Sequence, residues 1–151
     1  MESAVNPVGV GIIGSRFIAE IHADSLGKCP GAKAVAVASP TPGRAEEFAG
    51  KHGIPKAFTD YREMLRLPEL EAVLLCLPND LHCQVTVEAA KAGKHVICEK
   101  PLCMNLEEAE RMISATRRAG VKLLYAEELC FAPKYVRAKQ LVDEGALGKV
   151  F

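Results

Sequence analysis

Residues 8–22, VGVGIIGSRFIAEIH, constrain the fold more than any other stretch of the sequence. The segment begins as an apolar run and, after residues 14–16, continues with the helical spacing of Phe17, Ile18 and Ile21. This pattern predicts a strand, a tight turn and a helix. Such a turn points the free N–H groups and the positive end of the helix dipole beyond the strand, where they suit a phosphate group. We therefore expect this part of the chain to bind a nucleotide.

The register of the turn follows from the position of the apolar run. Gly9, Gly11 and Gly14 match the dinucleotide-binding pattern G-x-G-x-x-G, but that register would place the tight turn where a buried strand is the better interpretation. We place the turn at Gly14, with Ala19 small enough for close packing of helix against strand. Arg16 then stands where the second glycine usually lets the backbone approach a pyrophosphate. An ordinary strand-to-helix turn is the alternative interpretation.

Segments of strand and helix character alternate along the rest of the chain without a repeat or a low-complexity linker. After the first unit, the predicted strands are residues 34–38, 56–58, 72–77, 95–98 and 121–125, and the predicted helices are residues 44–52, 61–66, 81–92 and 106–119. This alternation predicts an α/β fold, a Rossmann-type doubly wound parallel sheet of six strands with right-handed crossovers.

Length, charge and cysteine usage exclude several other classes. The 151 residues fit one domain, and 19 Lys and Arg residues balance 19 Asp and Glu residues, which leaves no basic excess for nucleic acid. No apolar run approaches the roughly 20 residues that span a membrane, and no signal core follows the N-terminus. We expect a cytoplasmic protein without a membrane partner. The six cysteines form no C-x-x-C pair, which indicates reduced, mostly buried thiols and no metal site.

The end of the second predicted strand bears on the choice of cofactor. An NAD-binding domain usually has Asp or Glu there to accept hydrogen bonds from the adenosine ribose. This sequence has no acidic residue between the end of that strand and Glu46. Ser39, Thr41 and Arg44 are instead donors that suit a 2′-phosphate. We therefore favour NADP(H) over NAD(H); the alternative for Arg44 is a place at the start of a solvated helix.

Polar residues follow three predicted strands, at residues 14–16, 78–82 and 99–101. Ligands of doubly wound sheets lie beyond the carboxyl ends of the strands, so these loops should converge on one crevice. Lys100, directly after a buried strand, can hydrogen-bond an alcohol or carbonyl oxygen and stabilise negative charge during hydride transfer. Glu99 can accept hydrogen bonds from ribose hydroxyls or pair with Lys100. The alternative is a surface ion pair at the end of the strand.

Five motifs, in this order and spacing, together resemble the glucose-fructose oxidoreductase / inositol 2-dehydrogenase (Gfo/Idh/MocA) family. The motifs are Gly14-x-x-x-x-Ala19-x-x-His22, Tyr61-Arg62-Glu63-Met64-Leu65, Leu77-Pro78-Asn79-x-x-His82, Ala92-Gly93-Lys94-His95-Val96 and Cys98-Glu99-Lys100-Pro101-Leu102. The resemblance runs from about Val8 to Phe151. It implies an NAD(P)-dependent oxidoreductase that acts on sugars, inositols or related small hydroxy compounds.

The resemblance also implies a role for each site residue. Lys100 would be the catalytic lysine beside the reacting carbon, and Glu99 would contact the nicotinamide ribose. His22 would order the first helix without taking part in chemistry, and the alternative for His82 is packing of its loop. The remaining cofactor-binding residues would be Gly14, Ser15, Arg16, Phe17 and Ile18 at the pyrophosphate, Ser39 and Arg44 at the adenosine, and Leu77, Pro78, Asn79 and His82 near the nicotinamide half.

The sequence departs from the family pattern in two ways. Arg16 crowds the approach of the pyrophosphate, although its guanidinium can bind a phosphate oxygen. Members of the family usually continue into a second, mostly antiparallel α+β domain, which covers the substrate, forms the oligomer and supplies a histidine that acts with the lysine. We therefore interpret residues 1–130 as the dinucleotide-binding domain and residues 131–151 as a connecting helix and the approach to an absent second domain.

Members of the resembled family usually have a second domain, and its absence from this sequence bears on the function. We expect a fragment of a longer, homo-oligomeric oxidoreductase, with a naturally short protein as the alternative. Because no second domain orients a substrate, the chain alone should show little or no turnover. The competing function is a non-catalytic dinucleotide-binding or sensor module, against which the lysine at the hydride site argues.

Overall fold

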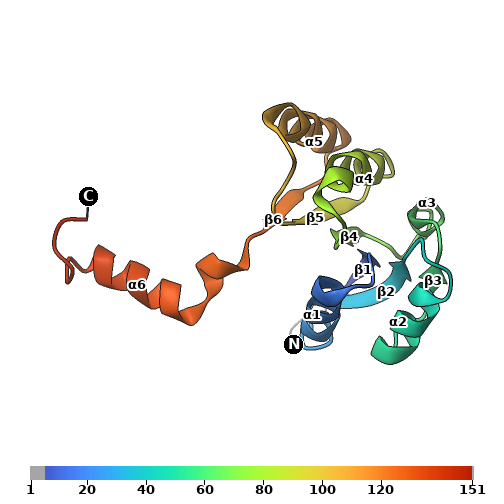
Figure 1. Ribbon diagram of the computed structural model, residues 1–151, viewed down its shortest axis with the longest axis horizontal. Helices are drawn as coiled ribbons and strands as arrows, with labels where there is room; N and C mark the ends of the chain where they lie inside the picture. Colours follow the sequence, from blue (N-terminus) through green and yellow to red (C-terminus); the bar gives the residue numbers. More distant parts are fainter. Residues whose placement is uncertain (1–5, 151) are drawn as a thin grey trace.

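The computed structural model describes residues 6–150, which form one six-stranded parallel sheet followed by a helical extension (Figure 1). The strand order is β3-β2-β1-β4-β5-β6, so β1 lies at the centre and the order reverses between β1 and β4. The predicted doubly wound Rossmann-type sheet is thus confirmed. The strands are β1 (Val8–Ile13), β2 (Ala32–Ala38), β3 (Ala57–Phe58), β4 (Ala72–Leu75), β5 (His95–Glu99) and β6 (Leu123–Ala126).

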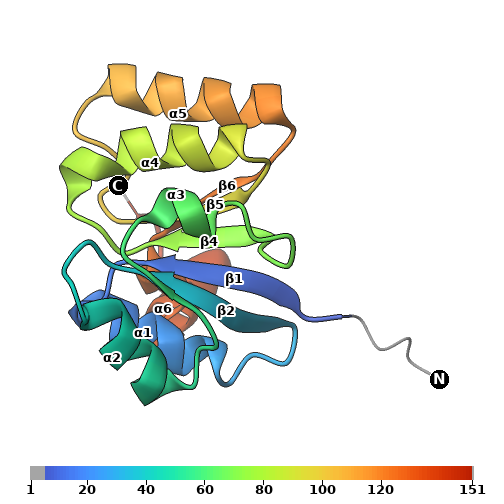
Figure 2. The ribbon, with the colours of Figure 1, turned by 90° about the vertical axis from the view of Figure 1, so that its right-hand side faces the viewer.

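Helices cover both faces of this sheet, with α1 and α2 on one side and α3, α4 and α5 on the other (Figure 2). A 3₁₀ helix, η1, and the last helix, α6, follow β6. The helices are α1 (Phe17–Leu26), α2 (Arg44–His52), α3 (Tyr61–Met64), α4 (Asn79–Lys91), α5 (Leu106–Ala119), η1 (Glu128–Phe131) and α6 (Pro133–Asp143).

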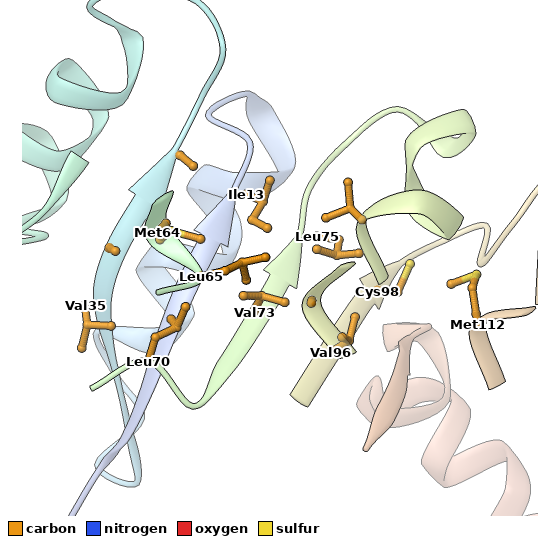
Figure 3. Packing of buried hydrophobic residues seen from close by; sticks show 14 of the residues in the cluster. Ile13, Val35, Met64, Leu65, Leu70, Val73, Leu75, Val96, Cys98 and Met112 are labelled. Carbon is orange, nitrogen blue, oxygen red and sulfur yellow. The ribbon is translucent and has the colours of Figure 1, made fainter. Parts of the chain in front are cut away.

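The core divides into two layers because successive side chains of a strand point to opposite faces of the sheet. In β4, Val73 and Leu75 pack toward α4 and α5, while Leu74 packs toward α1 and α2. Figure 3 shows the first layer, in which Met112 of α5 lies beside Cys98 of β5. Strands buried on both faces are continuous apolar runs, which is why the sequence revealed them so readily.

Several predicted boundaries are wrong by one or two residues. β2 begins at Ala32 because Ala32 and Lys33 already pair with β1, although a lysine interrupts the apolar pattern there. β4 ends at Leu75, before the chain turns away from the sheet, and α4 begins at Asn79, directly after Pro78 as its N-cap. β6 starts at Leu123 and not at residue 121. The loop after β4, which contributes to the crevice, is therefore residues 76–78 and not residues 78–80.

The predicted connecting helix is present as α6, and it leads away from the sheet (Figure 1). None of its residues is buried, and Tyr135 and Val136 expose apolar surface. Within residues 6–150, no helix combines the length and the apolar character that crossing a membrane requires.

Candidate functional site

The turn after β1 is possible only with glycine at position 14. Gly14 has φ of +116°, and a Cβ at this position would lie 2.2 Å from the carbonyl oxygen of Cys76 on the neighbouring chain segment. The backbone N–H of Gly14 donates to the carbonyl of Ala38 on the other side, at 2.9 Å. Gly9 and Gly11 lie inside β1, so the register predicted from the apolar run is confirmed. The turn leaves bare backbone at the carboxyl edge of the sheet, which is a cradle that suits a pyrophosphate.

The three polar loops meet at this edge because β1, β4 and β5 are neighbours in the sheet. His82, the fourth residue of α4, is fully buried, with Nδ1 3.0 Å from the carbonyl oxygen of Pro101 and Nε2 3.0 Å from that of Leu77. The ring therefore links the loop after β4 to the loop after β5. These two contacts support the packing role that the sequence offered as the alternative, and a cofactor contact of His82 stays a prediction.

Glu99 is anchored differently from the expectation. Glu99 is buried, with 6% of its surface exposed, and its Oε1 lies 2.6 Å from Nε2 of His22 on α1. Oε2 accepts a hydrogen bond from the backbone N–H of Lys100 at 3.0 Å. Among residues 6–150 no ion pair joins the ammonium group of Lys100 to this carboxylate, so the expected pairing of the two side chains is not formed. Lys100 itself is exposed.

His22 is thus the residue at this site whose contact was missed. We expected it only to order α1, but its ring lies across the crevice against β5 and lines a cavity of about 420 Å³ together with Glu99 and Tyr125. The helical spacing could have indicated that His22 faces this cavity, since it lies one turn after Ile18, which lines the same cavity. The identity of its partner could come only from the strand order.

The end of β2 forms the other half of the crevice. Ser39 is buried, and its hydroxyl oxygen accepts a hydrogen bond from the hydroxyl of Ser15 at 3.0 Å. On one side of this contact, Ser39 and Leu77 line an apolar cavity of about 230 Å³. On the other side, Arg16 and Arg44 line a larger cavity of about 530 Å³. Of the two predicted adenosine-end residues, Ser39 lines the smaller cavity and Arg44 the larger one.

The remaining predicted residues lie at the amino-terminal ends of two helices. Phe17, which is exposed, and Ile18, which is half-buried, begin α1. Pro78 is the N-cap residue of α4 and Asn79 its first residue. Both helix ends direct backbone N–H groups toward the carboxyl edge of the sheet, the arrangement that favours an anionic ligand.

The thiols near these loops are not activated. All six cysteines are free, as predicted; Cys76, Cys83 and Cys98 are buried, whereas Cys29 and Cys130 are exposed. Burial raises the pKa of the Cys98 thiol to about 12 and raises that of Cys76 as well. These two thiols therefore remain protonated at neutral pH.

Residues 8–127 match the family described as an oxidoreductase family with an NAD-binding Rossmann fold. Over 93% of this chain and 42% of the relative, the sequence is 36% identical to a myo-inositol 2-dehydrogenase of Thermotoga maritima. It is 38% identical to an NADP(+) scyllo-inositol 2-dehydrogenase of Bacillus subtilis, over 85% of this chain and 39% of the relative. The crystal structure of a Lactobacillus casei scyllo-inositol dehydrogenase with NAD(H) and scyllo-inositol superimposes with a TM-score of 0.88 and 29% identity, covering 95% of this chain and 43% of that one. The chain thus spans about two-fifths of the length of these proteins.

Proposed function

Because the chain belongs to the Gfo/Idh/MocA family of oxidoreductases with an NAD-binding Rossmann fold, we propose that it is the cofactor-binding part of an NAD(P)-dependent oxidoreductase. Its reaction would transfer hydride between the cofactor and a CH–OH group of a sugar, an inositol or a related polyol. The observation that carries this proposal is the convergence of the Gly14 turn, the His22–Glu99 contact and Lys100 at one edge of the sheet.

The residues of the crevice fit the cofactor and the reaction. A nicotinamide dinucleotide, when bound, supplies or accepts the hydride. The turn at Gly14 would present its bare backbone to a pyrophosphate, and glycine is required there because a Cβ would lie 2.2 Å from the carbonyl oxygen of Cys76. Lys100 would donate a hydrogen bond to the substrate oxygen and stabilise the charge that develops there. Glu99, held at one oxygen by His22 and at the other by the backbone of Lys100, would fix the position of this lysine.

Within this function we infer a preference for NADP(H) over NAD(H). The support is chemical: Ser39 and Arg44 offer donors and a positive charge where a carboxylate would select the unphosphorylated ribose. The relatives include proteins described with either cofactor, an NADP(+) scyllo-inositol 2-dehydrogenase and an NAD(H)-bound scyllo-inositol dehydrogenase. A direct comparison of the two cofactors on this chain is therefore needed.

We further propose that residues 1–130 act as the cofactor-binding domain and that residues 131–151 connect it to a substrate domain. The exposed apolar side chains of α6 and of η1, such as Tyr135 and Phe131, are surface that such a domain would cover. Assembly into a homo-oligomer and a cytoplasmic location belong to the same proposal. We expect the chain alone to turn over polyols slowly or not at all, because in this proposal the substrate domain orients the substrate against Lys100.

A fluorescence titration of this chain with NADPH and with NADH tests the proposal. We expect saturable binding of both, tighter for NADPH. Gly14→Asp should abolish binding of both because its side chain would collide with the carbonyl of Cys76 and displace the turn, whereas Gly50→Ala, at a helical position with open space around it, should leave binding unchanged. Far-UV circular dichroism of each variant checks that it is folded before binding is compared. Absence of saturable binding, or full binding by Gly14→Asp, would refute the proposed cofactor site.

A further inference from the structure

The larger cavity beside the Gly14 turn lies between the beginnings of two helices. Arg16 is the N-cap residue of α1, and Arg44 is the first residue of α2. Both line the cavity of about 530 Å³, together with Phe17, Glu20 and Lys51. None of the lining residues comes from the loops after β4 or β5, where Leu77 and Glu99 lie. The cavity is therefore on the α2 side of the turn, away from the path toward Lys100.

Some of the charged side chains that line this cavity form ion pairs with one another and others do not. Lys51 forms an ion pair with Glu20 at 2.7 Å, and Glu20 also contacts His52 at 2.6 Å. Glu47, the other carboxylate on the cavity wall, interacts electrostatically with Lys51 as well. Within residues 6–150, neither Arg16 nor Arg44 takes part in an ion pair. The two guanidinium groups are thus the cations of this cavity that are left for an anionic ligand.

The adjacent contact between the serines identifies which anion would reach this cavity. Ser15 directly precedes Arg16, and its hydroxyl bonds to Ser39 at the end of β2, the position at which dinucleotide-binding domains read the adenosine ribose. A group attached to that ribose and directed away from the sheet would enter the space between Arg16 and Arg44. The 2′-phosphate of NADP(H) is such a group, and as a monoester it carries close to two negative charges at neutral pH.

We propose that Arg16 is a specificity-determining residue that binds the 2′-phosphate of NADP(H) together with Arg44. This inference rests on the proposed function, since it requires a dinucleotide in the crevice. Arginine suits the task because its planar guanidinium donates two parallel hydrogen bonds to a phosphate. The replacement of the second fingerprint glycine is then a gain of selectivity, and not merely an obstruction of the pyrophosphate.

The two interpretations of Arg16 predict opposite results for Arg16→Gly. If Arg16 only crowds the pyrophosphate, the variant should bind NADPH and NADH more tightly. If Arg16 binds the 2′-phosphate, the variant should lose about 10-fold or more in affinity for NADPH, the range of a hydrogen bond to a charged group, with NADH nearly unchanged. Arg44→Ala should lower NADPH affinity in the same selective way.

Isothermal titration with 2′,5′-ADP and 5′-AMP isolates the adenosine half, because neither probe contains the nicotinamide or the second phosphate of the bridge. We expect Arg16→Gly to weaken 2′,5′-ADP and leave 5′-AMP unchanged. Arg118→Ala removes one exposed positive charge from α5, on the opposite face of the sheet, and should change neither affinity. If Arg16→Gly folds poorly, Arg16→Gln gives the same NADPH-to-NADH ratio test with a longer side chain at the helix start.

Each outcome separates this inference from the proposed function. Saturable binding of both cofactors by the natural chain, combined with equal effects of Arg16→Gly on NADPH and NADH, overturns the role of Arg16 and leaves the cofactor site intact. Tighter binding of both by Arg16→Gly also overturns it, in favour of crowding. If the natural chain binds neither cofactor, the proposed site and the inference fall together.

Discussion

Replacing Gly14 by alanine is the most direct physical test of the turn on which the site depends. The φ of +116° costs a residue with a side chain about 1–3 kcal/mol. The new Cβ would also lie 2.2 Å from the Cys76 oxygen, so the two segments would have to separate. Separation strains the hydrogen bonds from Cys76 N–H to Ile13, 2.8 Å, and from Gly14 N–H to Ala38, 2.9 Å. With about 1 kcal/mol for each bond, we expect Gly14→Ala to lower the free energy of unfolding by about 3–5 kcal/mol.

Two other glycines provide matched controls. Gly53 has φ of +65° and open space around its Cα, so Gly53→Ala should cost only the backbone term, about 1–2 kcal/mol. Gly50 lies inside α2, has no positive φ and has open space where a Cβ would lie. Gly50→Ala should therefore stabilise the protein by about 0.5–1 kcal/mol. Urea unfolding followed by far-UV circular dichroism measures all three. A cost for Gly14→Ala no larger than that for Gly53→Ala would refute the close approach of the Cys76 carbonyl.

Two further changes test contacts away from the turn. The Tyr61 hydroxyl donates to Glu88 at 2.8 Å, and burial with this bond raises its pKa to about 12. An unfolded tyrosine titrates near pH 10. The difference in the free energy of unfolding between the natural chain and Tyr61→Phe should therefore be full below about pH 10 and shrink between about pH 10 and 12. A difference that stays constant in urea unfolding over this pH range contradicts the prediction. The buried hydroxyl of Thr86 has no hydrogen-bond partner among residues 6–150, so Thr86→Val should raise the free energy of unfolding by about 1 kcal/mol. A loss of stability measured by the same method would contradict this.

The fold could be predicted because its signals are local. The β-branched run that becomes β1, the capping glycine Gly53 and the N-cap Asp60 each act within a few residues, and each occupies its predicted place. Boundaries were less certain where pairing overrides the local pattern. Lys33 belongs to β2 because its backbone pairs with Gly9, and this hydrogen-bonded ladder is indifferent to the charge of the side chain.

The contacts of the site could not be predicted in the same way. His22 and Glu99 are 77 positions apart, and they meet because β5 lies two strands from β1 on the side of the sheet that α1 overlaps. The sequence indicated a doubly wound sheet without fixing which helix would reach which strand end. For His82 the residue type suits both a ligand contact and a loop anchor, and its complete burial between two carbonyl groups depends on distant segments that no local pattern specifies.

The central position of β1 has a consequence for the growing chain. During synthesis from the N-terminus, β1 can pair with β2 early, but its other neighbour, β4, begins only at Ala72. Until then VGVGII is an edge strand, with unpaired N–H and C=O groups on the side that β4 later covers. The strand that begins the nucleotide cradle is therefore also the segment of the nascent protein most exposed to wrong pairing with another chain, and the arrival of β4 removes this hazard and completes the crevice wall in one step.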